Sequence, residues 1–207
     1  AKEVVDATYS TGSTSTASCF NFSNSLTTNR KDYNSIIMTF FKSTCYEDYL
    51  PYMTKGNDVV LVVNTTNLFG DEAGADDRNL DLFGDWDGGD IKYSFKYDIK
   101  EGTSGTDMIP AIRLSEMYYI MGEYFAYKDE FSKAGEMLDK VRYARGISTT
   151  NLASSIGSLE VFHTHLIKEM RREFVGEGQM FFQYKRLDQK PKDNVVFVFD
   201  KPNNEDI

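Results

Sequence analysis

The chain has 207 residues, long enough to bury a sizeable core, and its 41% hydrophobic and 27% charged residues are ordinary for a globular protein. Its formal net charge of −9 argues against a general nucleic-acid binder, which needs clustered positive charge, and an anionic membrane surface would repel it. No stretch is apolar for long enough to span a bilayer. The high aromatic content of 14% indicates that some rings lie outside the core.

The start of the chain and its cysteines bear on processing and redox state. The sequence opens at Ala1 without an initiator Met or a signal peptide, so we expect a processed chain or a fragment. Cys19 and Cys45 fit no metal or redox spacing. A disulfide between them would need an oxidising compartment, and two free thiols are the equal alternative.

The first third of the chain predicts a loop followed by two short elements. Residues 8–31 are rich in Ser, Thr and Asn and read as loop. Residues 33–46 carry apolar side chains at four-residue spacing, which predicts a helix, although their β-branched and aromatic content leaves a strand as the alternative. Residues 58–63 (DVVLVV) predict a strand.

Residues 64–90 are rich in Gly and Asp and predict a long loop. The loop ends in the acidic run Asp85-Trp86-Asp87-Gly88-Gly89-Asp90. Residues 91–97 then alternate apolar and polar side chains, the pattern of a half-buried strand.

From Pro110 onwards the pattern becomes helical. A first helix is predicted from Pro110 to Tyr127, and a second from about Glu130 to Arg145 with Gly146 as C-cap. A third helix starts near Ser158, breaks around residues 176–178 and resumes through Leu187. Residues 195–199 close the chain as an extended segment.

The first two helices fit a tetratricopeptide unit. Gly122 and Ala134 are twelve residues apart, at the positions where small side chains let two antiparallel helices approach closely. The Trp expected at the start of the unit is Tyr118, so the match is partial. A single repeat cannot bury its own faces, and other helices must stack on it. We therefore predict a mainly α fold of tetratricopeptide-like helical repeats with long loops and a few short strands.

The segment from Glu169 to Gly178 is dense in charges of both signs. Paired carboxylates could serve acid–base chemistry, as in a glycosidase. Arginine neighbours lower carboxylate pKa values, however, which is the reverse of what a general acid needs. We therefore predict a structural charge network and no catalytic residues; its members are Arg113, Glu116, Glu169, Arg171, Arg172 and Glu173.

A metal site is not predicted. His165 and Glu169 share a helix face at zinc-ligand spacing, but a third ligand is missing and His163 points elsewhere. No nucleotide-binding glycine motif and no nucleophile motif occurs in the sequence. We expect neither a cofactor nor a metal.

The loop around Trp86 is the candidate ligand site. Asp85, Asp87 and Asp90 do not follow the order of an EF-hand, and the simple interpretation is an acidic, solvated turn. Trp86 is the only Trp, and an exposed ring beside carboxylates suits a sugar. The alternative is a Trp that anchors the loop to the core.

Three blocks occur in order along the chain: IPAIRLSEMYYIMGE at residues 109–123, LDKVRYARG at 138–146 and IKEMRREFVGEG at 167–178. Together they resemble the SusD/RagB family of outer-membrane nutrient-binding lipoproteins. The family helix P-x-I-R-L-x-E-x-Y-L-I-x-A-E is similar to residues 109–123, its L-N-x-V-R-x-R-A/R-G to residues 138–146, and its I-x-x-E-R-R-x-E-F-x-x-E-G to residues 167–178. Asp76-Asp77-Arg78 matches a weaker upstream D-x-R, and residues 198–205 resemble the closing P-I-P-x-x-E without its first Pro.

The resemblance implies a function and a location. Such proteins cover a SusC-type TonB-dependent porin at the cell surface, capture glycan or in some members peptide, and attach to the outer membrane by an N-terminal lipid absent from this chain. The implied protein is not an enzyme. Its implied partners are the porin and a glycan or peptide, without nucleic acid. The alternatives are a tetratricopeptide-type protein-interaction module and, last, a glycoside hydrolase.

The same reading divides the chain into three parts. Residues 1–108 form a loop-rich mixed segment with short strands and the candidate ligand loop, residues 109–190 a helical core, and residues 191–207 an extended tail. Binding residues vary within the family and carry no motif, so Trp86 rests on its loop context alone.

Overall fold

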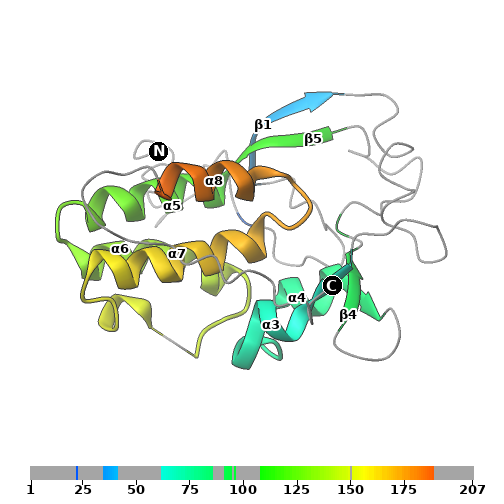
Figure 1. The fold of residues 1–207 in the computed structure, drawn as a ribbon, viewed down its shortest axis with the longest axis horizontal. Helices are drawn as coiled ribbons and strands as arrows, with labels where there is room; N and C mark the ends of the chain where they lie inside the picture. Colours follow the sequence, from blue (N-terminus) through cyan, green and yellow to red (C-terminus); the bar gives the residue numbers. More distant parts are fainter. Residues whose placement is uncertain are drawn as a thin grey trace, which may run out of the picture.

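The computed structural model of the protein describes residues 22, 35–41, 62–85, 91–94, 96, 108–149 and 151–188. Over these residues the fold is mainly α with a few short strands, as predicted. Figure 1 shows α5, α6, α7 and α8 in one half of the molecule and α3, α4 and β4 in the other. The predictions for Cys19, Cys45 and residues 195–199 lie outside the described residues.

The helical half contains four helices: α5 (Leu114–Ala126), α6 (Phe131–Ala144), α7 (Leu159–Glu173) and α8 (Gln179–Asp188). These positions confirm the second and third predicted helices and the break before α8. The Ser158 side chain accepts a hydrogen bond from the Val161 amide and caps α7, as predicted.

The end of α6 depends on a glycine. Gly146 follows the last turn with φ of +83°, a conformation that L-residues with a side chain rarely adopt. A Cβ there would also lie 2.7 Å from the Ala75 carbonyl oxygen. Gly146 therefore both ends α6 and lets residues 75–77 approach it.

Close packing of α5 on α6 forms the main core. A Cβ at Gly122 would lie 3.4 Å from the Ala134 carbonyl oxygen and 3.1 Å from the Phe162 ring, so the small residue lets α5, α6 and α7 meet. The tetratricopeptide assignment itself stays a prediction. Fifteen buried residues form this core: Leu114, Tyr118, Tyr119, Met121, Ala126, Ala134, Met137, Leu138, Val141, Leu152, Ile156, Phe162, Leu166, Met170 and Phe174.

A two-stranded antiparallel sheet lies beside the helices and corrects two predictions. β1 (Ile36–Phe41) pairs with β5 (Met108–Arg113), so the helix expected over residues 33–46 is wrong at 36–41, and the alternative of a strand holds there. The first helix begins at Leu114 instead of Pro110. Pro110 belongs to β5, which pairs with β1 in a two-stranded sheet. Both strands of such a sheet are edge strands, and an edge strand can accept a proline, which has no amide hydrogen to donate.

A three-stranded antiparallel sheet forms in the other half. Its order is β2 (Val62–Asn64), β4 (Ile91–Ser94) and β3 (Phe83–Asp85). Strands were predicted over 58–63 and 91–97; the structure has strand at 62–63 and 91–94, whereas residue 96 is in a turn, so the prediction is wrong there. The loop predicted over residues 64–90 is wrong in part, because residues 65–85 contain α3 (Thr65–Phe69), η2 (Gly70–Glu72), α4 (Asp77–Leu82) and β3.

Side-chain caps and a small core stabilise this region. Asn64 Oδ1 accepts from the Asn67 amide at the start of α3, and Asp76 Oδ1 accepts from the Arg78 amide at the start of α4. Leu68, Phe69, Leu82 and Phe83 form a second buried cluster. These short helices hold Glu72, Asp76 and Arg78 against α7, where the candidate site lies.

Candidate functional site

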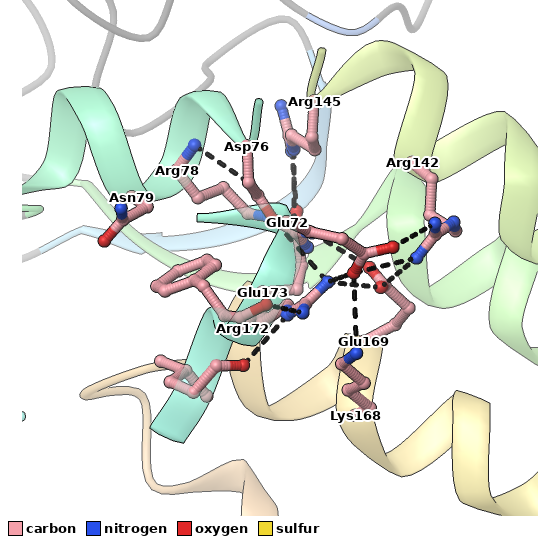
Figure 2. Close-up of polar contacts among 12 residues, drawn as sticks. Glu72, Asp76, Arg78, Asn79, Arg142, Arg145, Lys168, Glu169, Arg172 and Glu173 are labelled. Carbon is pink, nitrogen blue, oxygen red and sulfur yellow. Dashed lines mark hydrogen bonds and ion pairs between the residues drawn. The ribbon is translucent and has the colours of Figure 1, made fainter. Parts of the chain in front are cut away.

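A buried network of eight charged side chains joins the two halves of the molecule (Figure 2). Its members come from residues 72–78, from the end of α6 and from the second half of α7. Among the described residues, Asp139 and Lys168 lie at its edge, 3.6 Å from Arg142 Nε and 3.5 Å from Glu72 Oε2. The eight members themselves comprise four acidic and four basic side chains. They are Glu72, Asp76, Arg78, Arg142, Arg145, Glu169, Arg172 and Glu173.

Glu169 lies at the centre of the network. Its Oε2 accepts from Arg78 Nη2 over 2.9 Å, and its Oε1 accepts from Arg142 Nη1 and Arg172 Nη1, each over 3.0 Å. The residue is fully buried. One carboxylate therefore connects α4, α6 and α7.

Arg172 ties α7 to α3 and η2. Its Nε and Nη2 donate to the carbonyl oxygens of Leu68 (3.1 Å) and Phe69 (2.7 Å). Its Nη1 pairs with Glu72 Oε2 over 2.6 Å. The guanidinium satisfies carbonyls at the end of α3 that the short helix itself leaves open.

Glu173 lies one helical turn after Glu169 and pairs with Arg145 and, like Glu169, with Arg78. Arg145 Nη2 donates to Glu173 Oε1 over 2.6 Å, and Arg78 Nη1 donates to Glu173 Oε2 over 3.2 Å. The Asp76 carboxylate in turn accepts hydrogen bonds from Nε and Nη2 of Arg78. The D-x-R element thus orients Arg78 towards both glutamates of α7.

The electrostatics of the network favour charged carboxylates. Burial acts to raise the pKa of Glu72, Glu169 and Glu173, because a buried carboxylate loses its hydration. The hydrogen bonds and positive charges of the surrounding arginines outweigh burial and hold the pKa of all three below the usual range. These carboxylates are ionised at neutral pH and cannot donate a proton to a substrate.

A second buried cluster lies where β4, β5 and the turn before α8 meet. Glu177 Oε1 accepts from Lys96 Nζ over 2.5 Å and from Arg113 Nη2 over 2.8 Å. Lys96 Nζ also donates to the Glu173 carbonyl oxygen. Burial lowers the pKa of Lys96, an effect that the charge of Glu177 opposes. The cluster fixes the start of α5 against the end of α7.

The structure separates the six residues predicted as one network. Glu169, Arg172 and Glu173 are in the eight-residue network, and Arg113 is in the cluster with Glu177. Glu116 caps α5 by accepting from the Arg113 amide over 3.0 Å. Arg171 is exposed on α7.

The predicted ligand loop is described only at its first residue. Asp85 ends β3 with an exposed side chain, 3.6 Å from Lys92 Nζ. Trp86, Asp87 and Asp90 lie outside the described residues.

The histidines of α7 have different surroundings. His163 is buried, with its Nε2 3.4 Å from the Tyr127 hydroxyl. Burial lowers the pKa of His165. Among the residues that the structure describes, no group of three His, Cys, Asp or Glu side chains could hold a metal ion.

Sequence reasoning missed several members of the two clusters. Glu72 and Lys96 carry no motif, and only their positions in the fold identify them. The other missed residues were visible in the motifs: Asp76 and Arg78 in D-x-R, Arg142 and Arg145 in the second block, and Glu177 in the third. The available signal was that charged residues occur in each of the separate motif blocks, which suggests that the residues of different blocks pair with one another.

The fold and these clusters define a mainly α protein whose motif charges form buried ion pairs. A sequence model of the SusD family matches residues 38–204, and the chain therefore belongs to that family. No curated protein and no solved structure matches it. SusD family members are nutrient-binding proteins, generally without enzyme activity and typically associated with the outer membrane as lipoproteins. In the described part of this chain, no helix is both long and apolar enough to span a membrane.

Proposed function

We propose that this protein is a non-enzymatic, surface-exposed nutrient-binding lipoprotein of the outer membrane. It captures an oligosaccharide or polysaccharide and passes it to a SusC-type TonB-dependent transporter. The observation that carries the proposal is the family match over residues 38–204. Membership of the family supports nutrient binding. The glycan as ligand, the transporter as partner and the exposure at the cell surface are our inference.

The pairing of the carboxylates supports a binding role over a hydrolytic one. A glycosidase needs one carboxyl group whose pKa is raised, so that it can protonate the leaving oxygen. Glu169 and Glu173, two carboxylates considered for that role, are buried among arginines. The arginines lower the pKa of both carboxylates. Their arrangement is that of a structural ion network.

The β3–β4 hairpin supports the choice of Trp86 as a ligand contact. Phe83 packs in the buried cluster with Phe69 and Leu68, which holds the start of the hairpin. Lys96, two residues after β4, is held by Glu177. Fixed strands on both sides of a binding residue favour ligand binding, because these strands lose little conformational freedom when the ligand binds.

The test is binding of the intact protein to glycans, followed by the Trp86→Ala variant. We expect the wild-type protein to bind at least one glycan of a plant and microbial polysaccharide panel in calorimetry. We expect Trp86→Ala to weaken that binding at least tenfold, whereas Tyr124→Ala, which removes an exposed ring from α5, leaves it unchanged. Absence of binding to every glycan, or release of reducing sugar, would contradict the proposal.

Exposed aromatic side chains favour protein interaction as a second candidate function. Phe181 and Phe182 on α8 are each 68% exposed, and Tyr124 is exposed on α5. Exposed aromatics of this kind are common at protein interfaces. If the protein is an interaction module, Phe181→Ser should abolish co-purification with the SusC-type porin. In that case, Trp86→Ala should not change the affinity of the protein for any ligand. A member of the family that binds peptide would instead respond to a peptide panel.

A further inference from the structure

A surface pocket of about 590 Å³ lies between α6 and η3 (Leu152–Ser154). Its lining includes Glu136, Lys140 and Tyr143 of α6, facing Asn151 and Ala153. The volume falls within the range of about 300–1,000 Å³ that is usual for small-molecule sites. Of the described lining residues, Asp139 touches the charge network, 3.6 Å from Arg142 Nε, and the others belong neither to the network nor to β3 and β4.

The far wall of the pocket is held in place by two features of α6. A Cβ at Gly135 would lie 2.6 Å from the Ala153 amide nitrogen, so only glycine lets residues 152–153 pack directly on the helix. Asp139 is buried, and its two oxygens accept from the Leu152 and Ala153 amides, each over 3.1 Å. The position of residues 152–153, directly after Asn151, is therefore fixed before any ligand arrives.

The lining determines what kind of ligand fits. Tyr143 is 47% exposed and offers an aromatic face and a hydroxyl. Asn151 provides an amide that both donates and accepts. Asp139, the third charged lining residue, is buried and bonded to the Leu152 and Ala153 amides. The exposed charges of the lining are those of Glu136 and Lys140, which are opposite in sign and lie one turn apart. A ring beside mixed donors and acceptors suits a neutral, polyhydroxylated molecule, whose apolar face stacks while its hydroxyls hydrogen-bond.

We propose that this pocket is a subsite for neutral sugar units of the captured glycan, with Tyr143 as the stacking residue and Asn151 as a hydrogen-bonding residue. The inference rests on the proposed function, because it takes the captured nutrient to be a glycan. It adds a second contact point on the helical half, away from the hairpin that carries Trp86. A polymer that contacts both sites gains affinity through multivalency.

The experiment measures the intact protein against uncharged and charged saccharides. The uncharged probes are hexasaccharides of α-1,4-glucan, β-1,4-glucan, β-1,4-xylan and β-1,4-mannan; the charged probe is oligogalacturonate. For the best neutral binder we expect Tyr143→Ala and Asn151→Ala each to raise Kd about tenfold, and Tyr124→Ala to change it less than twofold. We also expect the bound hexasaccharide to protect Tyr143 from nitration. Circular dichroism checks that each variant is folded, and Tyr143 protection in the wild-type protein needs no variant.

The outcomes separate this inference from the proposed function. Wild-type binding that survives Tyr143→Ala and Asn151→Ala, with no protection of Tyr143, overturns the subsite and leaves glycan capture standing. Binding of oligogalacturonate or of peptides alone through Tyr143 overturns its assignment to neutral sugars. Absence of binding to any saccharide overturns both proposals.

Discussion

Arg78 and Glu169 lie 91 residues apart in the sequence, and Arg78 Nη2 donates to Glu169 Oε2 over 2.9 Å in the buried interior. This pair connects the weaker upstream motif, D-x-R, with the charged block of α7. Arg142 of the second block binds the same glutamate, and Arg113 of the first block binds Glu177 of the third. The motif charges of this chain therefore meet in space and hold its segments together.

Removal of the central carboxylate should strongly destabilise the fold. Glu169→Gln leaves Arg78, Arg142 and Arg172 with one buried negative charge fewer. Breaking a buried ion pair from one side costs about 3–5 kcal/mol. Urea unfolding should show a loss of that size, whereas Glu136→Gln, at an exposed position of α6, should stay within about 0.5 kcal/mol. A loss of less than about 1 kcal/mol for Glu169→Gln would contradict a stabilising role for the network.

Stability should fall in acid because of the network glutamates. Their folded pKa values are lowered, so between about pH 5 and pH 3 the unfolded chain, with carboxyl pKa values of about 4.3, binds protons that the folded protein does not. The free energy of unfolding therefore decreases as the pH falls through this window. Burial raises the pKa of Glu116, and that group acts in the opposite direction.

The Glu72→Gln variant tests which groups cause this acid dependence. Glu72 is the network carboxylate with some solvent exposure, so its replacement should be tolerated. The slope of unfolding free energy against pH should become shallower in the variant than in the wild type. The Glu136→Gln control should keep the wild-type slope. Equal slopes in all three proteins would mean that Glu72 does not contribute to the loss of stability in acid.

Gly135→Ala should destabilise the protein although alanine favours helices. The added methyl group would lie 2.6 Å from backbone atoms of residues 152–153, which must then move away from α6. Overpacking of this kind costs about 1–3 kcal/mol. Gly157→Ala, where a Cβ meets nothing within 4 Å, is the matched control and should be near neutral in thermal unfolding. A Gly135→Ala protein with unchanged stability would show that η3 is not packed against α6 as described.

Two glycines with positive φ allow the cost of backbone strain to be distinguished from the cost of a steric clash. At Gly178 the φ is +72° and a Cβ meets nothing within 4 Å, so Gly178→Ala should cost only the strain, about 1–2 kcal/mol. At Gly146 a Cβ also meets the Ala75 carbonyl oxygen and Asp77 Oδ1. Gly146→Ala should therefore cost at least about 1 kcal/mol more in chemical denaturation. Equal losses at both positions would contradict the close contact.

Long periodic segments were predictable, and short ones were not. The apolar spacing of α6 and α7 identified both helices, and Ser158 marked the start of α7, because caps and periodicity act within a few residues. Residues 36–41 were expected in a helix because their four-residue spacing fits one locally. Their strand form depends on β5, about 70 residues later, which the local pattern does not contain.

The region of α3 and α4 shows the same limit. Its Gly and Asp content predicted a loop, and helices of five and six residues are too short for a periodic signal. The caps Asn64 and Asp76 were the local clue. Packing of Leu68 and Phe69, together with the bonds from Arg172, stabilises these helices.

The sequence by itself determined the mainly α class, the positions of its longer helices and membership of the SusD family, since these depend on local periodicity and on the order of motifs. It also predicted that Glu169 and Glu173 carry structural charges beside arginines. Only the tertiary structure decided which arginines these are, because Arg78, Arg142 and Arg145 reach the glutamates through the packing of α4 and α6 on α7. Tertiary structure also formed the pocket beside Tyr143, because its two walls come from separate segments that pack together at Gly135 and Asp139.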